Sequence, residues 1–159
     1  MNKSIMHVSF LTDNMEEMIK FYTEKLGFTL KVLTRYRQYL NRDDRPKQKA
    51  IALEDPDRIF NAYLEACDGQ FVELLSASDG LNPHEGFNAA LGFSHFALLV
   101  DDIHEAYEEF QRKGIDTTSG ISKGPSGTYQ FWAHDPDMNF FEVMQFTDES
   151  YQVTGHIDN

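Results

Sequence analysis

The sequence predicts an α+β protein made of two tandem βαβββ modules. Its 159 residues suit one domain or two small fused modules. Short β-rich runs alternate with two segments whose apolar residues follow the period of an α-helix. The second strand and helix repeat the first at a constant spacing, which is typical of a duplicated unit.

The first module opens with a strand followed by a helix. Residues 5–12, IMHVSFLT, are β-rich, and residues 14–26 follow with one apolar helical face. That face consists of Met15, Met18, Ile19, Tyr22 and Leu26. Asp13 with Glu16 three residues later predicts a capping box, and Gly27 predicts the end of the helix.

The second module opens in the same way. Residues 93–100, FSHFALLV, form a predicted strand, and an amphipathic helix follows it. Superposing His7 on His95, an offset of 95 − 7 = 88, places Asp13 on Asp101. The repeat therefore assigns the two histidines the same position in two equivalent strands.

Candidate strands follow each helix. They are 29–36, 49–53, 61–66 and 70–75 in the first module, and 115–118, 129–134 and 140–146 in the second, where 115–118 has the weakest pattern. A turn sequence joins the last two strands of each module, CDG at 67–69 and DPDMN at 135–139.

The same patterns set the expected module boundaries. We expect a first module over 1–78, a linker over 79–91, a second module over 92–147 and a polar tail over 148–159. Within the first module, residues 37–59 are charged and lack a clear period, which predicts an irregular, mobile insertion between strands.

Composition narrows the expected partners of the protein. A net charge of −12 disfavours nucleic acid and anionic membrane surfaces, and a small-molecule substrate is expected instead. The longest apolar run, near FALLV, is too short to span a bilayer. Cys67 is the single cysteine, so no disulfide can form within the chain, and a cytoplasmic location is expected.

Four titratable residues occupy matching places in the two modules. His7 and His95 lie early in the first strand of each module. Glu73 in QFVELL and Glu142 in FFEVMQF lie in the last strand of each. Taken singly, such a histidine is more often a hydrogen-bonded core residue, and such a glutamate more often faces solvent. A carboxylate in an apolar strand is nevertheless costly to bury unless it is paired or metal-bound, and two imidazoles that converge with two carboxylates predict a divalent metal site.

These motifs resemble those of the vicinal oxygen chelate superfamily, the glyoxalase, bleomycin resistance and dioxygenase family. MEEMIKFYTEKLGF and SHFALLVDDIHEAYEEFQRKGI are similar to its two module openings. HDPDMNFFEVMQF is similar to its closing turn and ligand strand, with Met138 where the family favours glycine. The resemblance covers about residues 5–146 and implies a cupped mixed sheet around a metal, often closed by a second chain in a homodimer.

Within the superfamily, the His/Glu/His/Glu set is most similar to that of glyoxalase I, the lactoylglutathione lyase. The resemblance implies that all four residues bind Ni²⁺, Zn²⁺, Co²⁺, Mn²⁺ or Fe²⁺, because ligand type alone does not select one of these ions. It implies a lyase or isomerase reaction on a small carbonyl substrate through a metal-stabilised enediolate. Either Glu142 or Glu73 would move the proton, and Glu142 is the preferred catalytic residue.

The chain departs from glyoxalase I at two positions that hold glutathione in that family. Leu11 and Ala77 stand where an arginine and an asparagine are expected, so we expect the metal chemistry to be kept and the substrate to differ. Four aromatic residues near the predicted ligands would suit an apolar substrate, although aromatic residues in strands more often belong to the core. They are Phe71, Phe131, Trp132 and Phe141.

The sequence leaves two alternatives open. A ring-cleaving Fe²⁺ dioxygenase of the same superfamily would use His7, His95 and Glu142, and would not need Glu73. A non-catalytic binding protein would sequester a ligand between modules without a metal, although such a protein has no need of four ligands. Metal binding by Glu73 would distinguish the four-ligand enzyme from the dioxygenase.

Overall fold

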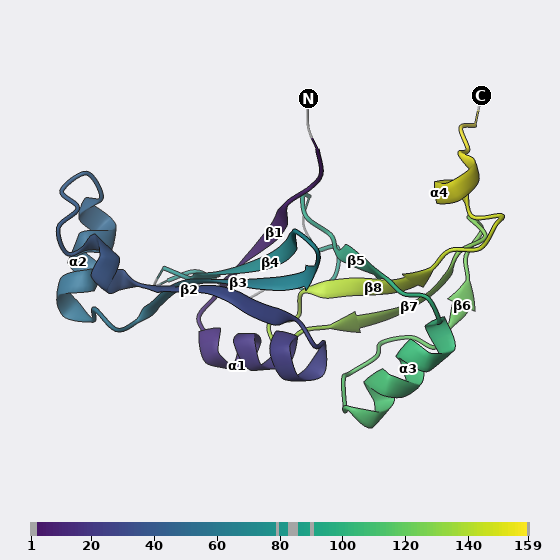
Figure 1. Cartoon of the computed structure of the whole chain (residues 1–159), viewed down its shortest axis with the longest axis horizontal. Coiled ribbons are helices and arrows are strands. Elements are labelled where there is room, and N and C mark those ends of the chain that lie inside the picture. The colour runs from purple at the N-terminus through teal and green to yellow at the C-terminus, as the bar shows by residue number, and fades with distance from the viewer. Residues whose placement is uncertain (1–2, 79, 83–85, 90, 159) are drawn as a thin grey trace. The chain divides into compact units, whose positions relative to one another are not determined.

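The chain folds into two compact units, Met1–Asn82 and Pro83–Asn159. The computed structural model describes residues 3–78, 80–82, 86–89 and 91–158, so part of the expected linker over 79–91 lies outside the described residues. Each unit holds one four-stranded mixed sheet (Figure 1). The predicted α+β architecture of two βαβββ modules is therefore confirmed.

The first unit contains a sheet with the strand order β1-β4-β3-β2. Its elements are β1 (His7–Thr12), α1 (Met15–Lys20), β2 (Thr29–Arg35), α2 (Pro46–Glu54), β3 (Ile59–Cys67) and β4 (Gln70–Ser76). β1 and β4 are parallel, whereas β3 is antiparallel to both of its neighbours. α1 continues into a π-helical turn over Phe21–Lys25, which confirms the helix predicted over 14–26.

The second unit repeats this topology with the strand order β5-β8-β7-β6. Its elements are β5 (Phe96–Leu99), α3 (Ile103–Arg112), β6 (Ser122–Lys123), β7 (Tyr129–His134), β8 (Phe140–Gln145) and α4 (Tyr151–Thr154). The strand predicted over 115–118 is reduced to a single bridge between Thr117 and Ala133. The expected polar tail is anchored to its own unit, because Ser150 is fully buried and the Tyr151 N–H donates to the Ser126 carbonyl at 2.9 Å.

Strand alternation gives each sheet one buried face and one open face. α1 lies along the buried face of the first sheet and α3 along that of the second (Figure 1). The buried sheet residues are Phe10, Ala62, Leu64, Val72 and Leu74 in the first unit, and Phe131, Ala133, Phe141 and Val143 in the second. The helices bury Met18 and Tyr22 in the first unit and Ile103 in the second. The open face of the first sheet carries His7 and Glu73, and that of the second carries Glu142.

The two helix starts differ in how they are capped. In the second unit, the Asp102 carboxylate accepts hydrogen bonds from the N–H groups of His104 at 2.8 Å and Glu105 at 3.0 Å. These bonds lower the pKa of Asp102, that to Glu105 contributing most. In the first unit, Asn14 precedes α1 and makes no side-chain capping bond, so the predicted capping box of Asp13 and Glu16 is wrong.

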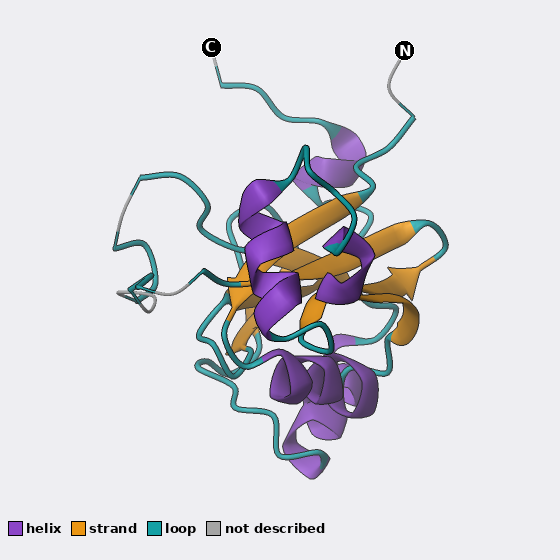
Figure 2. Cartoon of the chain, turned by 90° about the vertical axis from the view of Figure 1, so that its left-hand side faces the viewer, coloured by secondary structure: helices purple, strands orange, loops and turns teal. Residues whose placement is uncertain are grey.

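The segment 37–59 is largely helical, not irregular. A 3₁₀ turn over Tyr36–Tyr39 and α2 form a small helical lobe beyond the end of β2 (Figures 1 and 2). The strand predicted over 49–53 is therefore wrong, because those residues belong to α2. Pro46 stands at the start of α2, where its missing N–H costs no hydrogen bond, and the lysines and alanines that follow favour a helix. None of the described helices is long and apolar enough to cross a membrane.

Candidate metal centre

The register of the first sheet brings His7 and Glu73 together. β1 and β4 are parallel, and Ser9 lies opposite Glu73, two residues beyond His7 on the same face. His7 Nε2 is 3.5 Å from Glu73 Oε2, and Glu73 is only 7% exposed. The apolar strand therefore buries a carboxylate and places an imidazole beside it.

The second unit repeats the same geometry. β5 and β8 are parallel, and Ala97 lies opposite Glu142, again two residues beyond the histidine. His95 Nε2 is 3.5 Å from Glu142 Oε2, the same distance as in the first unit. Ala97 corresponds to Ser9 because 97 − 9 = 88, so the repeat in the sequence is also a repeat of sheet register.

Each histidine is oriented through its other ring nitrogen by the residue before it. His7 Nδ1 is 2.9 Å from Met6 Sδ, and His95 Nδ1 is 2.9 Å from Ser94 Oγ. Met6 and Ser94 are also equivalents, because 94 − 6 = 88. These contacts turn Nε2 of both rings toward the carboxylate, and a ligating histidine commonly has its second nitrogen engaged in this way.

The distance within each pair is close to that between two ligands of one ion. A direct hydrogen bond between nitrogen and oxygen is typically about 2.7–3.2 Å long, which is shorter than the 3.5 Å observed. Two donor atoms about 2.1 Å from a common ion are roughly 3.0–3.4 Å apart at octahedral or tetrahedral angles. Imidazole nitrogen and carboxylate oxygen also suit the predicted transition metals. Each unit supplies one such pair, and the described residues contain no group of three or more metal-binding side chains.

Two neighbours in the first unit hold the Glu73 carboxylate. Asn61 Nδ2 donates to Glu73 Oε1 at 3.0 Å, and Asn61 Oδ1 accepts in turn from the Thr34 hydroxyl. Tyr63 lies directly opposite Glu73 across the β3–β4 pair. Burial, followed by the hydrogen bond of its hydroxyl to Glu73, raises the pKa of Tyr63 above its usual value. The Tyr63 ring also meets the His7 ring edge-on, with 5.6 Å between centroids.

The Glu142 carboxylate has different surroundings. Trp132 takes the place of Tyr63 opposite it and meets the His95 ring at a centroid distance of 4.7 Å. Gln130 takes the place of Asn61, because 130 − 61 = 69 and 142 − 73 = 69. Among the described residues, the Glu142 carboxylate has its polar side-chain contact with His95. The two carboxylates therefore share a position but not an environment.

The aromatic residues near the predicted ligands divide between core and site. Phe131 and Phe141 are fully buried in the core of the second unit, whereas Trp132 lies on the open face beside His95. Phe71 lies on the open face of the first sheet, in edge contact with Tyr63 at 6.0 Å.

Sequence reasoning missed Asn61, Tyr63 and Phe87 as neighbours of the predicted ligands. The hairpin turn at 67–69 was a usable signal for Asn61 and Tyr63, because a short turn sets which residues face Glu73. For Phe87, which contacts the His95 ring at 6.3 Å, the sequence holds no such signal.

A cavity of about 500 Å³ lies elsewhere in the first unit. Thr12, Asn14, Arg35 and Arg58 are among the residues that line it, and none of the predicted ligands does so. Its Arg58 guanidinium is already bound to Ser76 Oγ at 3.1 Å and to the Ala77 carbonyl at 2.9 Å. The two His/Glu pairs, and not this cavity, therefore remain the candidate site.

Comparison with known proteins agrees with the geometry. The family model of the Glyoxalase/Bleomycin resistance protein/Dioxygenase superfamily matches residues 4–143. This chain belongs to that superfamily. The predicted membership of the vicinal oxygen chelate superfamily is thereby confirmed.

Several relatives of this superfamily member are named lactoylglutathione lyases. A probable chloroplastic lactoylglutathione lyase of Arabidopsis thaliana is 29% identical over 147 residues, which cover 90% of this chain and 36% of the relative. The chain spans only 36 to 44% of the length of this protein and of three other plant relatives. A probable lactoylglutathione lyase of Vibrio parahaemolyticus is 24% identical, and the match covers 97% of this chain and 99% of that protein.

Among solved structures, a glyoxalase family protein from Enterococcus faecalis superposes with a TM-score of 0.68. It is 25% identical in sequence, and the match covers 89% of this chain and 97% of the other. The fold of the superfamily is therefore shared along nearly the whole chain.

Proposed function

We propose that this chain is a metal-dependent enzyme of the glyoxalase I type, a lyase or isomerase that acts on a small carbonyl compound. The main observation in support of this proposal is that two His/Glu pairs occur at the same sheet register, each with 3.5 Å between Nε2 and Oε2. The lactoylglutathione lyase names of relatives at 24 to 29% identity support this reaction class. The substrate itself is taken up below.

His7, Glu73, His95 and Glu142 would hold the metal. When bound, a divalent ion supplies positive charge that stabilises the enediolate formed from the substrate. The chain's own contribution is to orient both imidazoles through Met6 and Ser94 and to keep the carboxylates on the open face of each sheet.

The different surroundings of the two glutamates assign them different roles. Glu73 accepts a hydrogen bond from the Asn61 amide at 3.0 Å, so moving it would break this bond. Glu142 has no comparable donor among the described residues and is freer to change its position. Glu142 is therefore the better proton carrier and Glu73 the better permanent ligand.

The proposed reaction is an internal redox exchange within one substrate molecule. In a hemithioacetal of a 2-oxoaldehyde, Glu142 would remove the proton from the carbon that bears sulfur and return it to the neighbouring carbonyl carbon. The proton of the hemithioacetal hydroxyl would move to the oxygen of that neighbouring carbonyl, so that both protons stay within the substrate. The first carbon is oxidised to a thioester and the second is reduced to an alcohol, so no external oxidant or reductant is needed. Catalysis by a well-placed general base of this kind is typically worth about 10²- to 10⁴-fold.

The first test is the metal content of protein purified without chelator, measured by elemental analysis. Wild type is compared with Glu73→Ala and with Glu65→Ala, a control that removes a carboxylate of the same sheet bound instead to Lys31 at 2.9 Å. Stoichiometric metal in wild type and Glu65→Ala, with clear loss in Glu73→Ala, supports the four-ligand enzyme. Metal retained in Glu73→Ala would favour the three-ligand dioxygenase, and a chain that takes up no metal would favour the binding protein.

A further inference from the structure

Three aromatic side chains gather beside His95 on the open face of the second unit. Phe87 lies 5.0 Å from Trp132 and 4.8 Å from Phe140, between ring centroids. Both Trp132 and Phe87 also contact the His95 ring, at 4.7 Å and 6.3 Å. Phe87, Trp132 and Phe140 are called the aromatic wall below. It lies next to a predicted metal ligand, so a group attached to a metal-bound substrate would reach it.

The aromatic wall is not a closed core. Phe87 remains 41% exposed, and Trp132 and Phe140 are only partly buried, unlike Phe131 and Phe141 on the other face of the sheet. Rings that stay open beside a polar site offer apolar contact area to a ligand.

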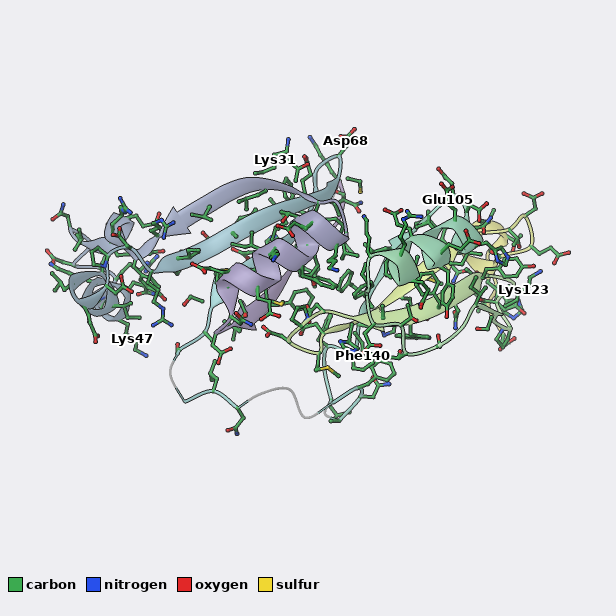
Figure 3. The ribbon with its side chains drawn as sticks, turned by 90° about the horizontal axis from the view of Figure 1, so that it is seen from below. Lys31, Lys47, Asp68, Glu105, Lys123 and Phe140 are labelled. Carbon is green, nitrogen blue, oxygen red and sulfur yellow. The ribbon has the colours of Figure 1, made fainter. Side chains whose placement is uncertain are left out.

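Charge on the second unit disfavours an anionic ligand. Residues 83–159 contain 3 Lys and Arg against 13 Asp and Glu, whereas residues 1–82 contain 11 against 13. Two of the three cations are already paired, Lys113 with Glu109 at 2.6 Å and Lys123 with Glu149 at 3.4 Å. Lys123 lies in the edge strand β6, at the other end of the second unit from Phe140 (Figure 3). The net negative charge of the second unit as a whole therefore disfavours a ligand with free carboxylates.

Apolar side chains also extend along the strands that carry the histidines. Leu11 and Leu99 occupy equivalent positions, because 99 − 11 = 88, four residues after each histidine on the open face. Leu11 is 57% exposed and Leu99 is 61% exposed. Each of these leucines thus adds exposed apolar surface to the open face of its own sheet.

We propose that the aromatic wall binds an uncharged aryl group of the substrate, so that this chain selects neutral, aryl-bearing carbonyl compounds over anionic ones. The inference rests on the proposed function for the reaction and on the second unit alone for the binding surface. It names a substrate class that the lactoylglutathione lyase names of the relatives do not imply.

The chain carries its own reporter for the test. Trp132 is the single tryptophan and belongs to the aromatic wall, so its fluorescence reports binding there without any turnover. The Ni²⁺-loaded protein is titrated with benzohydroxamic acid and acetohydroxamic acid, which chelate through the same two oxygens and differ in phenyl against methyl. We expect benzohydroxamic acid to bind at least about tenfold more tightly.

Variants of the aromatic wall test whether it causes the preference for benzohydroxamic acid over acetohydroxamic acid. Phe87→Ala should reduce the ratio of the two affinities to within about threefold, and Phe140→Leu should also lower it. The matched control is Tyr151→Ala, which removes another aromatic residue that is 41% exposed but lies in α4, and it should keep the wild-type ratio. Thermal melting confirms that each variant is folded. A wild-type ratio near one, or a ratio unchanged in both wall variants, overturns the inference.

A kinetic comparison tests the charge selection. Phenylglyoxal is supplied as its hemithioacetal with 2-mercaptoethanol, which is neutral, or with glutathione, which is anionic. We expect kcat/KM for the neutral adduct to equal or exceed that for the glutathione adduct. A glutathione preference greater than about tenfold overturns the inference and leaves the proposed function standing.

Failure of the proposed function and failure of the aryl-binding inference give different experimental results. If Ni²⁺ leaves Trp132 fluorescence unchanged and no hemithioacetal is turned over, the proposed function fails. The titrations with metal-free protein then decide the inference separately. A tighter response to benzohydroxamic acid that is lost in Phe87→Ala supports the wall as an aryl site, and the absence of such a preference overturns it.

Discussion

The two units of this chain place the same His/Glu pair in the same register but surround it differently. In the first unit, Asn61 donates a hydrogen bond to the carboxylate, and Tyr63 lies opposite it in the neighbouring strand. In the second unit, Trp132 occupies the position of Tyr63 and joins an aromatic cluster beside His95. The duplicated fold thus keeps the same His/Glu geometry in both halves, while Asn61 supports the carboxylate in one half and aromatic rings lie beside the histidine in the other.

The different surroundings of the two glutamates follow from one hairpin position in each unit. Tyr63 and Trp132 face Glu73 and Glu142 across equivalent antiparallel pairs. The tyrosine ring contacts His7 edge-on and its hydroxyl can hydrogen-bond the carboxylate, whereas the indole ring packs against Phe87 and His95 and has no hydroxyl. We therefore expect substitutions at equivalent positions of the two units to have unequal effects.

The largest expected difference is between the two glutamates. Glu142→Gln should lower kcat by about 10²- to 10⁴-fold at saturating metal, because it removes the proposed base. Glu73→Gln should chiefly weaken metal binding and recover much of its turnover when metal is in excess. Steady-state kinetics across a metal titration measure both effects. Retained turnover in Glu142→Gln, or equal losses in the two variants, would contradict the assignment.

A smaller difference is expected among the residues that support the carboxylates. Asn61→Ala should weaken metal affinity about tenfold, because partners of metal ligands typically contribute about 10- to 100-fold. Gln130→Ala, the equivalent change in the second unit, should leave the affinity within about twofold. Competition with a chromophoric chelator gives both constants, and equal effects would remove the distinction between the units.

At alkaline pH, ionisation of Tyr63 should reduce the stability of the fold. Its folded-state pKa is raised, chiefly by burial and next by its bond to Glu73, so the folded protein holds this proton more tightly than the unfolded chain. The resulting stabilisation is complete below the ordinary tyrosine pKa of about 10 and is lost as the pH rises through the raised value.

The melting temperature measured against pH is the corresponding experiment. The advantage of wild type over Tyr63→Phe should shrink above about pH 10. Tyr129→Phe, a tyrosine change in the second unit, is the control for general alkaline loss. A constant difference between wild type and Tyr63→Phe across this range would argue against the raised pKa.

The smallest expected effect concerns the turns that join the last two strands. Gly69 and Met138 are equivalent, because 138 − 69 = 69, and both have positive φ, at 73° and 64°. This conformation strains a non-glycine residue, and Met138 is 40% exposed and loses little packing if removed. Met138→Gly should raise the free energy of unfolding by about 0.5 kcal/mol, and Gly69→Ala should lower it by about 1 kcal/mol. Urea unfolding measures both, and a destabilised Met138→Gly would show that the methionine side chain contributes packing.

The homodimer and the cytoplasmic location stay predictions. Sedimentation of the purified protein tests the first, and it also bears on the proposed site because the resemblance implies a cup closed by a second chain. The predicted ligand set likewise stays a proposal until metal content is measured.

Much of the fold could be predicted because local patterns agree with it. The helical period of Met15, Met18 and Tyr22 reappears as the buried face of α1 and its π-helical continuation. Two of the expectations that proved wrong also depended on local patterns. Residues 49–53 were expected to form a strand but belong to the helix that begins at Pro46, and Asp13 was expected to cap a helix whose boundary residue is Asn14.

The sequence by itself determined the duplicated architecture and the two histidines and two glutamates in matching strands, because repeat spacing and strand alternation are local properties of a chain. The tertiary structure alone decided that His7 meets Glu73 and His95 meets Glu142, since parallel pairing joins strands that are far apart in sequence. It also decided that Asn61 holds one carboxylate and that Phe87, from the expected linker, packs beside His95. Contacts of this kind depend on how strands and loops are brought together in space, which no local period encodes.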